Sequence, residues 1–151
     1  MKLVALAILL CLCSACVPLP HFETQRPHLT GTLTVNGAPL NGAQVRVSVG
    51  HGTDWSCSTA AAVATTDKNG YFELAGDETF RFFRTVIGDP YYTYQLCISD
   101  GARMYLGFRA SGVGYPPDAL ALRCTISPES TPVVKDTPLS TSRKFAICTP
   151  G

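Results

Sequence analysis

The chain is poor in charged residues and in long apolar runs. Lys, Arg, Asp and Glu make up 15% of its 151 residues, and the formal net charge is +1. Nucleic-acid binding depends on a clustered basic surface, so this composition argues against a nucleic-acid partner. No apolar run reaches the roughly 18 residues of a membrane-spanning helix, so we expect no helical span in the mature chain. The apolar fraction of 46% is nonetheless sufficient for the core of one globular domain.

Signatures of catalytic and metal sites are also missing. The three histidines, His21, His28 and His51, show no i, i+2 or i, i+4 pairing, so we interpret them as solvated side chains. There is no G-x-S-x-G elbow of a serine hydrolase. Asp77-Glu78 favours a solvated turn over a weak calcium site. We therefore predict a chain that is not an enzyme and has no catalytic residues, no metal and no cofactor.

The first residues have the features of an export signal. Lys2 provides a short positive start, and Leu3 to Leu12 has the length of a signal-peptide core. The next residues, Cys13-Ser14-Ala15-Cys16, resemble the lipobox of bacterial lipoproteins, with Cys13 in place of the usual Leu. The resemblance implies a signal peptide at residues 1–15 and a lipid on Cys16. The alternative is an ordinary secretory signal cut near Ala15, with Cys16 free.

Cleavage after Ala15 would leave eleven basic and eleven acidic side chains. Such a chain has no net charge to steer it toward an anionic partner. The residue after the lipid cysteine is Val17, and the absence of aspartate there implies, by the same resemblance, anchoring at the outer membrane, facing the periplasm. Prolines in residues 16–28 predict a stiff tether before a domain at residues 29–151.

Four cysteines follow the anchor: Cys57, Cys97, Cys124 and Cys148. An even number in an exported chain predicts disulfides, and the absence of a C-x-x-C pair disfavours structural zinc. Three connectivities are possible. We favour Cys57–Cys97 with Cys124–Cys148, because the second bond would pin the last strand to its neighbour.

Alternation of apolar and polar residues predicts a series of short, half-buried strands. The alternation is clearest at residues 45–49, 71–74, 91–99, 102–110 and 119–126. Asp100-Gly101 predicts a hairpin between the third and fourth of these. We interpret the alanine-rich Thr59–Thr66 as a strand, and residues 111–118 and 127–140 as loops. The pattern predicts an all-β sandwich of seven to nine short strands.

Two motifs resemble carboxypeptidase regulatory-like domains. The first runs from Gly31-Thr32-Leu33-Thr34-Val35 through Gly37-Ala38-Pro39-Leu40 to Gly42-Ala43-Gln44-Val45-Arg46-Val47, and the second is Thr66-Asp67-Lys68-Asn69-Gly70-Tyr71-Phe72. The resemblance covers residues 30–74 and implies a transthyretin-like sandwich without catalytic residues. The second motif also has a direct physical reading. Asp67 can cap its own turn, Gly70 can adopt a positive φ, and Phe72 then enters the core.

Aromatic side chains on predicted loops are the candidate partner-binding residues. Trp55 stands in one polar loop and Tyr115 in another. Exposed loop aromatics anchor protein or sugar partners, although both rings could instead cover the sandwich ends. Tyr91 and Tyr105 are predicted on outer strand faces, in a patch with neighbouring arginines.

These features predict a non-catalytic lipoprotein of the cell envelope. It would act as a binding or structural module in the periplasm or at the outer membrane, with a protein or glycan partner. The alternatives are a periplasmic inhibitor or immunity-type lipoprotein and a secretion-system lipoprotein, which would join a lipid cysteine to a similar sandwich. An enzyme would need ionisable residues that only folding brings together.

Overall fold

The computed structural model is all-β, which confirms the predicted fold class. It describes residues 20–49, 57, 60–82, 90–133 and 146–151. None of these residues belongs to a helix that could cross a membrane. The strands are β1 (His21–Arg26), β2 (His28–Val35), β3 (Ala38–Pro39), β4 (Gln44–Val49), β5 (Ala62–Thr65), β6 (Tyr71–Leu74), β7 (Asp77–Arg81), β8 (Tyr91–Asp100), β9 (Arg103–Val113), β10 (Ala119–Ile126) and β11 (Cys148–Pro150).

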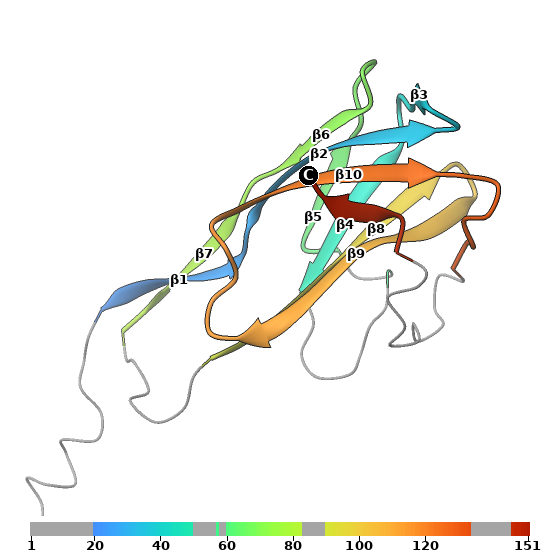
Figure 1. Ribbon diagram of the computed structural model, residues 1–151. Helices are drawn as coiled ribbons and strands as arrows, with labels where there is room; N and C mark the ends of the chain where they lie inside the picture. The colour runs from blue at the N-terminus through green and yellow to red at the C-terminus, as the bar shows by residue number, and fades with distance from the viewer. Residues whose placement is uncertain (1–19, 50–56, 58–59, 83–89, 134–145) are drawn as a thin grey trace, which may run out of the picture.

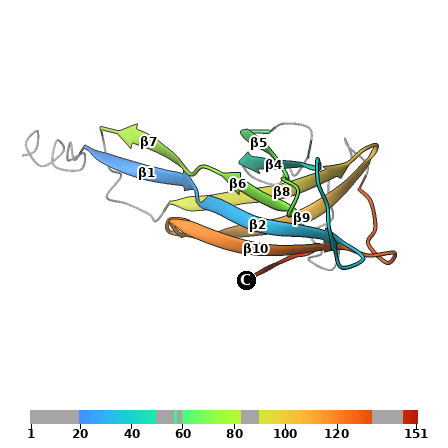
Figure 2. The ribbon, with the colours of Figure 1, turned by 90° about the horizontal axis from the view of Figure 1, so that it is seen from above.

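Two sheets form the body of the molecule (Figure 1). One follows the order β11-β10-β2-β3, with β6 also on β2, and the other follows β5-β4-β8-β9. Seen from above, they form two layers (Figure 2). Leu33 and Phe72 from the first sheet and Val45, Leu96 and Tyr105 from the second belong to one core, and each is at most 2% exposed. Two sheets around one core are consistent with a β-sandwich.

Both disulfides have the connectivity that we favoured from the sequence. Cys124 and Cys148 are directly opposed residues of β10 and β11, with Cα atoms 4.0 Å apart, so the bond pins the last strand to its neighbour. Cys57 is bonded to Cys97 of β8, with Cα atoms 5.9 Å apart. Cys57, Cys97 and Met104 form a small second cluster outside the main core.

The turn of the second motif is built as the sequence predicted. The Asp67 carboxylate accepts hydrogen bonds from the backbone N–H groups of Asn69 and Tyr71, each at 2.8 Å. Gly70 has a φ of +72°, and the side chain of Phe72 is 1% exposed. Thr66 is buried beside this turn, where its Oγ1 donates to the Leu40 carbonyl at 2.7 Å and accepts from the Ala43 N–H at 3.0 Å. These contacts tie the two motifs together.

The hairpin at Asp100-Gly101 is confirmed, but its outer face differs from the prediction. The register between β8 and β9 shifts at Leu96/Cys97, where Gly107 of β9 is the extra residue of a β-bulge. A bulge reverses which face the following side chains take. Tyr105 therefore lies opposite Ile98 in the core at 2% exposure, whereas Tyr91 is 63% exposed. The predicted patch of Tyr91 with Tyr105 is wrong for this reason.

The predicted tether is wrong for residues 21–28, because β1 pairs antiparallel with β7 and β2 begins at His28. We call the β1–β7 pair the arm; it projects from the body beyond the ends of β2 and β6, with β1 leading into β2 and β6 leading into β7 (Figures 1 and 2). The register of β2 with β6 continues through Arg26↔Asp77. Pro27 has no N–H to donate to the ladder, which explains why the arm and the body are separate sheets. At the base of the arm, the buried Arg26 donates from Nη1 to the Ala75 carbonyl at 2.9 Å.

Two other assignments differ from the prediction. Asp77-Glu78, predicted as a solvated turn, begins β7, and residues 111–113, predicted as loop, continue β9. The predicted strand within Thr59–Thr66 is confirmed as β5. Eleven strands among the described residues exceed the predicted seven to nine, because the arm adds two and β3 has two residues.

Candidate functional site

The arm has two chemically different faces. Side chains of an antiparallel pair alternate between the faces, and directly opposed residues share one. Phe22 opposes Phe80 on the outer face, whereas His21 opposes Arg81 and Glu23 opposes Thr79 on the inner face. The inner face is turned toward the end of the body where β8 begins and β9 ends, because Tyr115, which follows β9, is bonded to Glu23.

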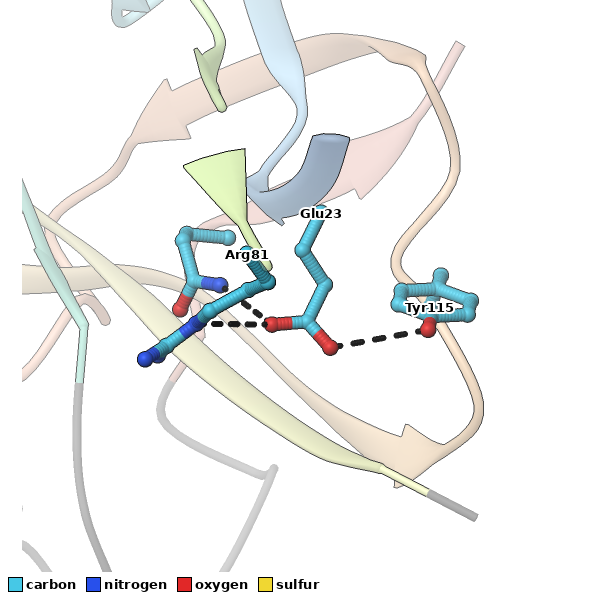
Figure 3. Close-up of polar contacts among 4 residues, drawn as sticks. Glu23, Arg81 and Tyr115 are labelled. Carbon is cyan, nitrogen blue, oxygen red and sulfur yellow. Dashed lines mark hydrogen bonds and ion pairs between the residues drawn. The ribbon is translucent and has the colours of Figure 1, made fainter. Parts of the chain in front are cut away.

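The carboxylate of Glu23 is the centre of the polar contacts on the inner face (Figure 3). One oxygen accepts from the Arg81 Nε at 3.3 Å and from the Gln25 Nε2 at 3.4 Å. The other accepts from the Tyr115 hydroxyl at 3.5 Å. The Glu23 side chain is 20% exposed and that of Arg81 is 56% exposed. The charges of Glu23 and Arg81 therefore compensate each other at the rim of a partly enclosed space.

A cavity of about 200 Å³ lies beside this cluster, and we call it the arm pocket. It is lined by the tyrosines Tyr91, Tyr92 and Tyr115, the prolines Pro90 and Pro116, the polar residues Glu23, Thr24, Gln25, Arg81 and Thr93, and Val49 and Gly114. Ligand pockets for drug-sized molecules commonly measure about 300–1,000 Å³, so this one suits a single ring or a short side chain. Aromatic walls and a few convergent polar groups are typical of such sites.

The aromatic wall is continuous with the core. Tyr92 stacks on Tyr94 with ring centroids 6.1 Å apart, and Tyr94 in turn lies 6.4 Å from the Phe108 ring. Burial, with a smaller effect of Tyr92, raises the pKa of Tyr94 to about 12. The pocket wall is thus supported from behind by packed side chains.

The described lining residues with ionisable side chains are Glu23, Arg81 and the three tyrosines. None of the described lining residues is His, Cys or Lys, and the Glu23 carboxylate accepts hydrogen bonds from Arg81, Gln25 and Tyr115. In the ranges that the structure describes, no three His, Cys, Asp or Glu side chains are grouped to hold a metal ion. His28 lies elsewhere, on β2, with its Nε2 3.0 Å from the Glu73 carboxylate of β6.

Of the sequence-predicted site residues, Tyr115 lies at the pocket and is 42% exposed. Trp55 and the lipidation residue Cys16 lie outside the described residues. Glu23 and Arg81 were not predicted from the sequence. Glu23 had been assigned to the tether, and Arg81 had been assigned to no strand. The alternation of Phe22 with Glu23 and of Phe80 with Arg81 was the available signal.

No family model, curated protein or solved structure matches this chain. The likeness of residues 30–74 to carboxypeptidase regulatory-like domains therefore rests on the two motifs.

Proposed function

We propose that this chain is a lipid-anchored protein of the cell envelope that binds a ligand in the arm pocket and catalyses no reaction. In this proposal residues 1–15 are a signal peptide, Cys16 carries the lipid and holds the protein at the periplasmic face of the outer membrane, and the body is a transthyretin-like domain. The lipobox-like Cys13 to Cys16 and the motifs in residues 30–74 support these assignments. Two disulfides suit an exported protein, because such bonds persist in oxidising compartments.

The observation that carries the binding role is the Glu23 cluster. Its carboxylate is held from both sides, by Arg81 at 3.3 Å and by Tyr115 at 3.5 Å, next to the exposed ring of Tyr91. Because the two charges compensate, the pocket favours a neutral ligand with many hydroxyl groups. A carboxylate and a guanidinium can accept from and donate to such groups, while a tyrosine ring covers the apolar face of a sugar. The ligand class that fits best is a glycan of the envelope.

The test is a titration of the mature protein in detergent with N-acetylglucosamine oligomers and with oligosaccharides released from lipopolysaccharide, followed by calorimetry. We expect binding of one of these, and a loss of about tenfold or more in affinity in Glu23→Gln, because a charge-assisted hydrogen bond contributes about 1.5–3 kcal/mol. Tyr115→Phe should weaken binding less, since the ring remains.

The chain provides a matched control. On β6, the Tyr71 hydroxyl donates to the Glu73 carboxylate at 3.3 Å, a similar pair that is not among the residues lining the arm pocket. Glu73→Gln and Tyr71→Phe should leave the affinity unchanged. Equal losses in both pairs, or capture of an envelope protein that Glu23→Gln does not weaken, would contradict the assignment of the ligand to this pocket.

The anchor is tested separately by mass spectrometry of the mature protein. We expect an N-terminal Cys16 carrying diacylglycerol, and release of Cys16→Ser from the membrane fraction. A mature protein that begins at Cys16 with an unmodified thiol would show an ordinary secretory signal instead.

A further inference from the structure

The outer face of the arm exposes large apolar side chains. Phe22 is 70% exposed and Phe80 is 55% exposed, and their rings meet edge to face with centroids 5.5 Å apart. Phe82 follows the last residue of β7 and is 54% exposed. A two-stranded ribbon has little stability of its own in water, and exposed apolar patches mark interaction sites. We therefore expect another apolar surface to cover the outer face of the arm.

The sequence indicates what lies next to this face. His21 begins β1 and is five residues after Cys16. An extended chain spans at most about 3.6 Å per residue, so the strand begins no more than about 18 Å from the lipid-modified residue. Phe22 is the second residue of that strand. If Cys16 is anchored, the phenylalanines are held within reach of the lipid headgroups.

We propose that Phe22 and Phe80 form a membrane-contact face that inserts into the interfacial region of the bilayer to which Cys16 is attached; this inference rests on the proposed lipid anchor. The two acyl chains of the anchor already give stable membrane association, and exposed aromatic side chains beside it add a contact in the interfacial region, where aromatic residues are enriched. The face would orient the domain as well as hold it.

The charges on the arm agree with an apolar contact. Arg81 and Glu23 pair on the inner face. Glu78 opposes Thr24, which places it on the outer face but nearer to the body than Phe80. The described residues at the outer tip are thus phenylalanines, with no cluster of Lys or Arg to attract anionic lipids. The contact should be insensitive to salt, unlike one that depends on basic residues.

This orientation also has a consequence for the arm pocket. The pocket lies on the inner face of the arm, with Glu23, whereas the phenylalanines lie on the outer face. A bilayer against the outer face would leave the pocket directed away from the lipid, open to a ligand in the periplasm.

The test uses the full mature, lipidated protein in vesicles of phosphatidylethanolamine and phosphatidylglycerol. In a Trp55→Phe background, Phe22→Trp provides a single fluorophore on the outer face, and Val63→Trp provides a control on β5, where Val63 is 55% exposed. Replacing the acyl chains with brominated ones should lower the emission of the Phe22→Trp protein to about half or less, because interfacial aromatics lie beside the upper acyl chains. The emission of the Val63→Trp protein should not change.

A variant that fails to fold is recognised by free thiols, and Phe80→Trp then repeats the measurement from β7. Vesicle flotation and the mass of Cys16 report the anchor independently. Lipidated protein that floats, while Phe22→Trp and Phe80→Trp are quenched no more than Val63→Trp, would overturn the membrane-contact face and leave the anchor intact. The same result with chemical cross-links between copies would assign the face to a second copy of the chain. An unmodified Cys16 would remove the anchor and this inference with it.

Discussion

At the scale of single residues, two glycines show how much a turn depends on the absence of a Cβ atom. Gly37 and Gly70 both have positive φ, +85° and +72°. A Cβ on Gly37 would meet nothing within 4 Å, whereas one on Gly70 would overlap the Leu33 carbonyl oxygen. The first position requires glycine for its conformation alone, and the second requires it for its conformation and for space.

We therefore predict different costs for two substitutions. Gly37→Ala should lower the free energy of unfolding by about 1–2 kcal/mol through backbone strain alone. Gly70→Ala should cost at least about 3 kcal/mol, because the Leu33 strand must also move. Denaturant unfolding of both variants measures this difference, and equal costs would contradict the packing of the second motif on β2.

Tyr94 makes stability depend on pH at the alkaline end. Its pKa is raised to about 12 by burial, with Tyr92 as the smaller cause, against 10.0 for the free side chain. Above pH 10 the unfolded chain loses this proton while the folded chain keeps it, so stability is full below pH 10 and is lost as the pH rises toward 12. Tyr94→Phe should flatten this decline in the unfolding midpoint. An equally steep decline in that variant would exclude Tyr94 as its source.

At the scale of elements, the sequence could predict most strands, because apolar alternation and Asn-Gly or Asp-Gly turns are local signals. These local signals could not predict which face of the sheet the side chains of residues 103–106 take. The bulge at Gly107 depends on how β9 meets β8, and on the close approach of Gly107 to the Leu96 carbonyl and the Cys148 sulfur. The arm was missed because its ladder continues beyond Pro27, where a proline suggested a linker.

The candidate site could be predicted only in part, because local patterns indicate single residues but not contacts between strands that are far apart in the sequence. Tyr115 stood out as an aromatic residue beside prolines. Glu23 and Arg81 are 58 residues apart and meet because β1 pairs with β7, a contact that no local pattern indicates.

The Cys124–Cys148 bond stabilises one specific element, β11. Replacing both cysteines with Ser should lower the free energy of unfolding by about 2–4 kcal/mol, mainly by freeing the unfolded chain. Because β11 has three residues, we also expect faster amide exchange at Gly151, whose N–H donates to the Ala121 carbonyl at 3.0 Å. A Cys57→Ser/Cys97→Ser variant is the control for that exchange. Unchanged exchange in the first variant would show that β11 holds without its disulfide.

At the scale of the whole molecule, the arm connects the proposed lipid anchor, the exposed phenylalanines and the arm pocket. It starts a few residues after the proposed lipid, its outer face exposes phenylalanines, and its inner face forms the pocket with the end of the sandwich. The proposed function therefore depends on ligand binding at the arm pocket.

The most direct measurement is amide chemical-shift mapping of the isotope-labelled mature protein in detergent during titration with the oligosaccharide that binds. If the ligand binds in the arm pocket, the largest shifts should cluster at the lining residues 23–25, 81, 91–93, 114 and 115. Shifts that cluster instead on β6, β10 or the Asp100-Gly101 hairpin, with the arm unchanged, would contradict it.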